Sequence, residues 1–230
     1  MKEKKFLPII GLSVVLLYFI FNTFQIIPLS LMGIDYNNMR LISKVCYLLG
    51  TELLFIIILF LIYKKKLTKD FKDYISNFKP YMKKYMEYWA LAFGLMIISN
   101  ILIITIFPNS ISANQETINS IFKTAPLYMI FSAVIFAPFV EEIVFRLSFK
   151  NIFKNNTLFI ILSGLVFGLL HVVGNFNNWI DLIYIIPYSI PGIVFAYTLV
   201  KSKNIFIPIS LHLFHNGFMM LLQTILMFLI

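Results

Sequence analysis

Residues 41–63 read LISKVCYLLGTELLFIIILFLIY, an apolar run far longer than a single β-strand. A helix of about 20 predominantly apolar residues is what a hydrocarbon core about 30 Å thick requires, so this stretch predicts a transmembrane helix. The whole chain has the same bias. Its 230 residues are 60% hydrophobic and only 13% charged, with a mean hydropathy of +0.89. A soluble globular domain does not have this composition, and most of the chain is expected to have lipid as its solvent.

The remaining apolar runs have similar lengths and predict about seven transmembrane helices in all. Alternating apolar and polar positions, which the strands of a membrane barrel require, are absent from them. The fold class is therefore predicted as an all-α polytopic membrane bundle, with residues 1–230 forming one integral membrane domain. The predicted spans are residues 6–27, 41–63, 86–107, 125–149, 157–173, 180–200 and 205–228.

Basic residues occur mainly in alternate loops between these spans. If the N-terminus lies inside, only Arg40, Lys44 and Lys123 fall outside, and the inner side collects Lys2, Lys4, Lys5, Lys64, Lys65, Lys66, Lys69, Lys72, Lys79, Lys83, Lys84, Lys150, Lys154, Lys201 and Lys203. The positive-inside rule then predicts an inner N-terminus and an outer C-terminus. This topology accounts for the net charge of +9, and no nucleic-acid partner is expected. An abundance of Ile, Asn, Lys and Phe points to an AT-rich bacterial genome, and so to a bacterial plasma membrane.

The basic connection at residues 64–84 has aromatic and aliphatic residues at helical spacing among its lysines: Phe71, Tyr74, Ile75 and Phe78. Such a pattern is typical of a helix lying along the membrane surface, which Pro80 would interrupt. An ordinary lysine-rich loop is the alternative.

Ionisable residues inside a membrane span are costly and mark functional sites by default. The span at 125–149 contains Glu141, Glu142 and Arg146. Neighbouring residues point about 100° apart on a helix, while Glu142 and Arg146 have the i, i+4 spacing that favours an ion pair. Glu141 is then left without a local counter-charge in an apolar setting. This makes it the candidate general base for activating water.

Two further spans carry imidazole and amide groups. Phe167 and His171 share one helical face, and His212 and Asn216 share another by the same i, i+4 spacing. Polar residues on three separate membrane helices predict a functional cluster between residues 125 and 220, the proposed catalytic core.

The order Glu-Glu-x-x-x-Arg, Phe-x-x-x-His and His-x-x-x-Asn, each on its own hydrophobic helix, resembles the CPBP family of intramembrane proteases. That family includes the CAAX prenyl endopeptidases and bacterial proteins tied to bacteriocin immunity. Two features depart from its pattern: Leu147 stands where a small residue is common, and His215 lies outside the motifs. We interpret His215 as a packing residue.

What the resemblance implies is peptide-bond hydrolysis by a glutamate-activated water. By position, Glu141 and His171 would polarise the water, and His212 and Asn216 would stabilise the oxyanion. Glu142 and Arg146 would hold their helix in register. The expected partners are membrane lipid and a membrane-associated peptide or protein substrate.

Glutamate and histidine also invite a metal hypothesis, since both can ligate zinc. No helix carries a His-x-x-x-His pair, and Glu141 and Glu142 diverge. We therefore expect no metal and no other cofactor, with a catalytic zinc as the alternative.

The depths of the candidate residues pose a geometric problem. Counted from the inner lysines at about 1.5 Å per residue, Glu141 and His212 lie roughly 13 Å deep and His171 roughly 25 Å deep. Straight helices would keep them apart. The cluster therefore requires that Pro138 displaces its helix, or that the loop at 155–156 dips into the bundle.

Two other functions remain possible for such a chain. Buried acidic and basic residues also form proton relays in ion-coupled transporters, although no internal repeat of the kind common in transporters is visible. A non-catalytic immunity or interaction protein is the third hypothesis. Glu52, a further acid inside the span at 41–63, is expected to pair with Asn100 or another polar neighbour.

Overall fold

The chain folds into helices joined by short connections, and no strand occurs in its described part. The computed structural model describes residues 2–108, 110–174, 176 and 178–229, with side chains within residues 6–225. The predicted all-α class is confirmed.

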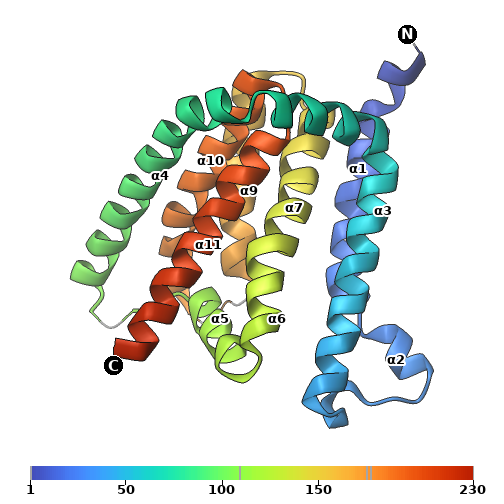
Figure 1. Cartoon of the computed structure of the whole chain (residues 1–230). Helices are drawn as coiled ribbons and strands as arrows, with labels where there is room; N and C mark the ends of the chain where they lie inside the picture. Colours follow the sequence, from blue (N-terminus) through green and yellow to red (C-terminus); the bar gives the residue numbers. More distant parts are fainter. Residues whose placement is uncertain (1, 109, 175, 177, 230) are drawn as a thin grey trace.

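The N-terminal half consists of long helices with short elements at their ends (Figure 1). In chain order they are α1 (Lys2–Phe24), α2 (Ile27–Leu31), the 3-10 helix η1 (Tyr36–Asn38), α3 (Leu41–Ser76), α4 (Phe78–Ile106) and α5 (Ala113–Thr124).

The C-terminal half begins with one continuous helical segment in which two stretches, η2 and η3, are π-helical. This segment comprises α6 (Pro126–Ile130), η2 (Phe131–Phe136), α7 (Ala137–Glu142), η3 (Ile143–Ser148) and α8 (Phe149–Ile152). The remaining elements are α9 (Asn156–Val173), the 3-10 helix η4 (Trp179–Tyr184), α10 (Ile185–Ser202) and α11 (Phe206–Leu229).

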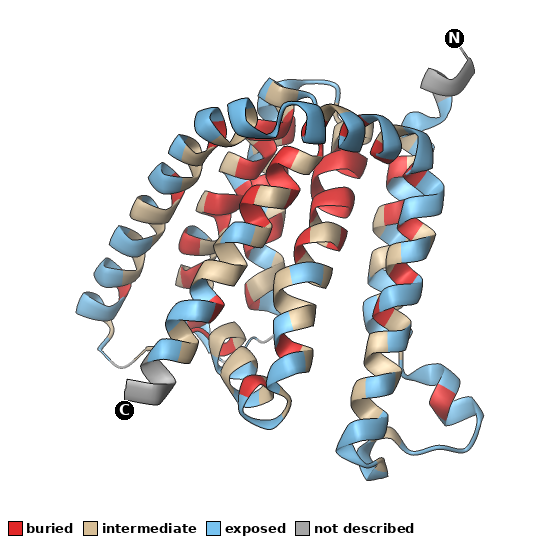
Figure 2. Cartoon of the chain, viewed as in Figure 1, coloured by how far each residue is buried: buried red, intermediate tan, exposed pale blue. Residues whose placement is uncertain are grey.

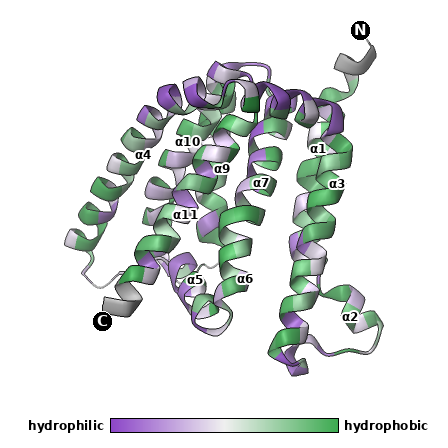
Figure 3. Cartoon of the chain, viewed as in Figure 1, coloured by the Kyte–Doolittle hydropathy of each residue, from purple (hydrophilic) through white to green (hydrophobic). Residues whose placement is uncertain are grey.

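Six helical segments within the described residues are long and apolar enough to cross a membrane. Many of their residues are both exposed and hydrophobic (Figures 2 and 3), as a lipid-facing surface requires. The chain is thus a polytopic membrane protein. Although α11 runs through the bundle beside α4 and α7 (Figure 1), it is not among the six. The count of seven spans and the orientation stay predictions.

The basic connection is helical, and its course across one end of the bundle follows from a bend at Tyr63. This residue has non-helical φ and ψ angles of −104° and 16° inside α3. Beyond it the helix turns across the end where the α10–α11 connection also lies (Figure 1). The break before α4 falls at Asn77, not at Pro80 as the sequence suggested. Pro80 is accommodated in the first turn of α4, where a missing amide donor costs little.

A polar network fixes this surface segment to the α10–α11 connection. Asp70 is buried and accepts a hydrogen bond from the backbone amide of Ile205 (3.0 Å). Asn204 donates to the Asp70 carbonyl (2.8 Å) and to the Asp73 carboxylate (2.7 Å). Lys66 pairs with Asp70 at 2.8 Å. The three hydrogen bonds of Asn204 and Ile205 join residues more than 130 positions apart and fix the position at which α11 begins.

The tightest helix pair is formed by α9 and α10, which meet through small residues. A Cβ atom built on Gly168 would collide with the Ser189 side chain and lie 2.7 Å from the Ile185 carbonyl. One built on Gly164 would collide with Ile193. Small residues four positions apart allow this close approach between membrane helices. The register of α9, and with it the position of Phe167 and His171, depends on these contacts.

Gly168→Val is expected to destabilise the protein by about 1–3 kcal/mol, the usual cost of overpacking a close contact. The free energy of unfolding in mixed micelles measures the effect. Gly94→Ala is the matched control, because a Cβ there meets no atom within 4 Å and alanine favours the helix. Equal stability of the two variants would contradict the close α9–α10 contact.

Candidate functional site

The segment that carries the acidic motif is π-helical on both sides of α7. Pro138 lies in the first turn of α7 and has no amide hydrogen for the preceding turn. Single π-helical turns are rare and are frequent at functional sites. In η2 the carbonyl of Ala133 accepts a hydrogen bond from Asn216 Nδ2 (2.7 Å). The irregular helix therefore makes a direct contact with α11.

Glu142 is the centre of a buried charge network. Its Oε2 lies 3.1 Å from Arg146 Nε, so the expected i, i+4 ion pair is present. Its Oε1 lies 2.9 Å from His212 Nδ1. The side chains of Glu142 and Arg146 are both 0% exposed. Sequence reasoning gave Glu142 a role only in helix register, and it did not foresee the bond to a histidine 70 residues away.

The guanidinium of Arg146 lies against an aromatic face. Its Cζ is 4.5 Å from the ring centroid of Phe167. Within the described residues, none of its nitrogens has a partner with hydrogen-bond geometry, and the 3.1 Å contact with Glu142 is an ion pair of poor alignment. Charge attraction to Glu142 and the cation–π contact thus hold this side chain.

His212 lies between the two neighbouring glutamates. An ionised Glu142 can only accept, so His212 Nδ1 donates to it. The other ring nitrogen, Nε2, is 3.9 Å from Glu141 Oε2. The His212 ring is stacked on Phe195, with centroids 5.1 Å apart, and meets Phe167 edge-on at 5.6 Å. The ring is therefore fixed by both its hydrogen bond and its aromatic contacts.

Glu141 is less enclosed than its neighbour. Its side chain is 16% exposed, against 0% for Glu142. Its Oε2 is shielded from solvent and lacks a hydrogen-bond partner among the residues that the structure describes. The nearest charged or polar contact recorded for this oxygen is thus His212 Nε2, at 3.9 Å.

His171 reaches the same cavity as His212 but has no polar contact with Glu141 within the described part of the chain. Its Nδ1 lies 2.9 Å from the Phe167 carbonyl, and its ring stacks on Tyr188 with centroids 4.8 Å apart. It follows Phe167, which touches both Arg146 and His212, by one turn of α9. His171 and Glu141, the pair for which straight helices posed a depth problem, thus make no polar contact within the described residues.

Of the two explanations for that depth problem, the dipping loop is wrong. Asn155 and Asn156 are exposed. Asn155 caps α9 by accepting a hydrogen bond from the Leu158 amide at 3.0 Å. The departure from a straight α-helix lies instead in the π-helical turns on either side of Pro138.

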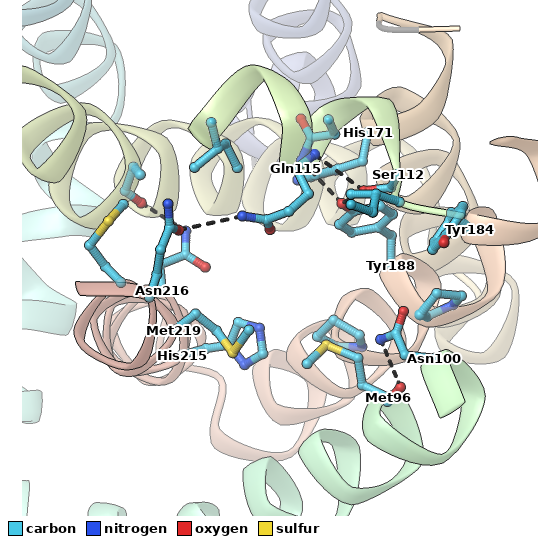
Figure 4. Close-up of a pocket in the computed structure, with 18 of the residues that line it drawn as sticks. Met96, Asn100, Ser112, Gln115, His171, Tyr184, Tyr188, His215, Asn216 and Met219 are labelled. Atoms are coloured by element: carbon cyan, nitrogen blue, oxygen red, sulfur yellow. Dashed lines mark hydrogen bonds between the residues drawn. The ribbon is translucent and has the colours of Figure 1, made fainter. Parts of the chain in front are cut away.

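A cavity of about 440 Å³ opens between α4, α5, α9, α10 and α11. Figure 4 shows His171, Asn216, His215 and Tyr188 around it. None of the described residues that line it is an aspartate, glutamate, lysine or arginine. His215 also meets the Phe93 ring at 6.1 Å, which agrees with a packing role. The cavity is thus formally uncharged, with imidazole and amide groups in its wall.

The acid in α3 pairs with polar neighbours other than Asn100. Glu52 Oε1 accepts hydrogen bonds from Tyr128 (3.0 Å) and Ser132 (2.8 Å). Asn100 instead donates to the Met96 carbonyl in its own helix (2.9 Å) and lines the cavity. Glu52 therefore ties α3 to α6 and η2.

Among the described residues there is no group of three or more His, Cys, Asp or Glu side chains placed to hold a metal ion.

The chain is similar to known proteins chiefly through the segment that carries the three motifs. Residues 123–218 match the family model described as Type II CAAX prenyl endopeptidase Rce1-like. The resemblance drawn from the motifs is thereby confirmed over this segment. No solved structure matches the chain significantly.

Three bacterial relatives cover different shares of the sequence. The membrane-embedded CAAX protease MroQ of Staphylococcus aureus is 27% identical over 220 residues, 87% of this chain and 85% of that protein. The UPF0177 protein YvdC of Lactococcus lactis is 27% identical over 184 residues, 77% and 68% of the two chains. YdiL of Bacillus subtilis is 30% identical over 115 residues, 49% of this chain but only 43% of its own length. Together with the membrane helices, these similarities support a multi-pass bacterial membrane protein whose motif-bearing segment resembles CAAX-type membrane proteases.

Proposed function

We propose that this protein is an intramembrane endopeptidase that cleaves a membrane-associated peptide or protein without a metal. One observation carries the proposal: Glu141, His212, Glu142 and Arg146 form a largely buried chain of charged and polar groups, which reaches a cavity of about 440 Å³ through His212. Such groups are costly inside a membrane, and a cavity wall with imidazole and amide groups is what acyl-transfer chemistry requires.

In the proposed reaction, Glu141 accepts a proton from a water molecule whose oxygen attacks the scissile carbonyl carbon. His171, from the cavity wall, would help to orient that water. The proton is then delivered to the leaving nitrogen as the C–N bond breaks, which yields a carboxylic acid and an amine.

Asn216 and His212 would donate hydrogen bonds to the oxyanion of the tetrahedral intermediate. One Asn216 amide hydrogen is engaged with Ala133, and the second remains for the substrate. His212 donates from Nδ1 to Glu142, so it can donate from Nε2 only as an imidazolium. Glu142 and Arg146 would set the orientation of the His212 ring.

Purified protein in detergent is expected to cleave members of a broad library of membrane-associated reporter peptides, and cleavage is expected to survive a chelator. Mass spectrometry of the products identifies the cleaved bond. Loss of cleavage with the chelator, followed by recovery with zinc, would contradict the metal-independent mechanism. A well-folded protein that cleaves nothing in the library would contradict the protease function itself.

A further inference from the structure

Tyr188 of α10 connects His171 to a different part of the fold. Its ring is stacked on the His171 ring with an interplanar angle of 24°. Its hydroxyl is 2.8 Å from Ser112 Oγ, and it accepts a hydrogen bond from Asn114 Nδ2 at 3.3 Å. Figure 4 shows His171, Tyr188 and Ser112 together at one side of the cavity. A single side chain therefore contacts both the predicted site and the start of α5.

Helix α5 covers part of the cavity with its N-terminal half. Ser112, Asn114, Gln115 and Ile118 all line the cavity. Besides the contacts with Tyr188, this half is held by Gln115, which donates to Gln223 Oε1 of α11 at 3.4 Å. Neutral hydrogen bonds of this kind each contribute only about 0.5–1.5 kcal/mol net. The described hydrogen bonds of the N-terminal half of α5 are thus individually weak.

The C-terminal half of α5 is fixed in another way. Phe122 packs in a buried apolar cluster with Met129 of α6 and Met220 of α11, and Ile118 and Ile121 pack against that cluster. Asn119 also accepts a hydrogen bond from Gln223 of α11 at 2.9 Å. Helix α5 is thus held by apolar contacts at its C-terminal end and by hydrogen bonds at its N-terminal end. This arrangement suits a lid that opens about a hinge at its C-terminal end. The hinge would lie near Phe122.

We propose that Tyr188 is a positioning residue for His171, and that α5 is a lid over the cavity whose closed position is set through the Tyr188 hydroxyl. The positioning role rests on the proposed protease function. The lid does not, because it follows from the cavity and its covering helix alone.

The orientation of the His171 ring gives the physical reason for this coupling. The Phe167 carbonyl can only accept, so His171 Nδ1 carries the proton and Nε2 is left for the cavity. The hydrogen bond fixes Nδ1, and the stack on Tyr188 fixes the plane of the ring. When α5 lifts, Tyr188 loses its hydroxyl partners, and the His171 ring loses part of its restraint. Closure of α5 over a bound peptide restores both.

Kinetics of three variants test the positioning role on a reporter peptide that the wild type cleaves. Tyr188→Leu removes ring and hydroxyl, and its kcat is expected to fall about tenfold or more, as misplacement of a reacting group by 1 Å can cost more than that. Tyr188→Phe keeps the ring, and its kcat is expected to stay within about threefold of the wild-type value. The main effect of losing the hydroxyl is expected in KM. Ser112→Ala should match Tyr188→Phe. Unchanged kcat in Tyr188→Leu, or equal loss in the Leu and Phe variants, would overturn positioning by the ring.

Chemical labelling tests the lid without any need for activity. In a Cys46→Ser background, which removes the exposed free cysteine, Met96→Cys places a thiol in the cavity wall. Its alkylation by a maleimide is expected to become about fivefold faster in Tyr188→Phe and Ser112→Ala, since loss of about 1 kcal/mol changes an opening equilibrium by that factor. Thr105→Ala is the matched control, because the Thr105 hydroxyl bonds only within α4 among the described contacts.

Unchanged alkylation in both hydroxyl variants would overturn the lid. Faster alkylation in a protein that cleaves no peptide would confirm the lid, and it would refute the proposed function together with the positioning role. The two failures are therefore distinguishable.

Discussion

Glu141→Gln is expected to lower the rate of peptide cleavage by about 10²- to 10⁴-fold, the usual contribution of a general base. Glutamine has nearly the same shape and cannot accept the proton from water. Because Glu141 Oε2 has no hydrogen-bond partner among the described residues, the change should leave the free energy of unfolding close to the wild-type value. Turnover of a fluorogenic reporter peptide and unfolding in mixed micelles measure the two effects.

The matched control for this variant is Glu87→Gln, the same chemical change at an exposed position of α4. It should leave both quantities unchanged. If Glu141→Gln cleaved the peptide at the wild-type rate, another group would have to be the base. A different result would favour the binding or transport hypotheses. In that case the folded wild-type protein would cleave no peptide, and Glu141→Gln would still give the wild-type phenotype in cells.

Local spacing and hydropathy were enough to predict those parts of the structure that arise within one helix. The apolar run at 41–63 lies within α3, and the i, i+4 spacing of Glu142 and Arg146 produces the ion pair. Both depend only on helix geometry and on the cost of exposing polar groups to lipid. Neither requires knowledge of which helices are neighbours.

Contacts between distant helices were not predictable in the same way. The bond between Glu142 and His212 joins α7 to α11, and Glu52 finds its partners in α6 and η2 rather than in α4. Sequence alone does not say which helices pack together. The π-helical turns have no clear sequence signal besides Pro138, yet they position Ala133 to accept from Asn216. Tyr188 was missed because a tyrosine in a membrane span carries no charge to mark it.

Arg146→Met is expected to destabilise the protein by about 3–5 kcal/mol, the largest stability effect of any single substitution considered for this chain. The reason is that the buried Glu142 carboxylate would lose the positive charge that compensates it. Glu142 is 0% exposed and would keep only the bond to His212, and an uncompensated carboxylate in an apolar interior is strongly unfavourable. Loss of the contact with Phe167 adds to the cost. The midpoint of unfolding in mixed micelles, at constant lipid composition, measures it.

The double variant Glu142→Gln with Arg146→Met separates charge from packing. Replacing a buried ion pair by neutral groups of similar volume is often nearly neutral for stability, so the double variant is expected to be more stable than Arg146→Met alone. Its cleavage rate should nevertheless stay low, because the hydrogen bond from His212 Nδ1 would then end on a neutral amide, which holds the ring less firmly than a carboxylate does. A double variant as unstable as the single one would show that Arg146 acts through its packing against Phe167. The same variant with wild-type cleavage would show that His212 needs no charged partner at position 142.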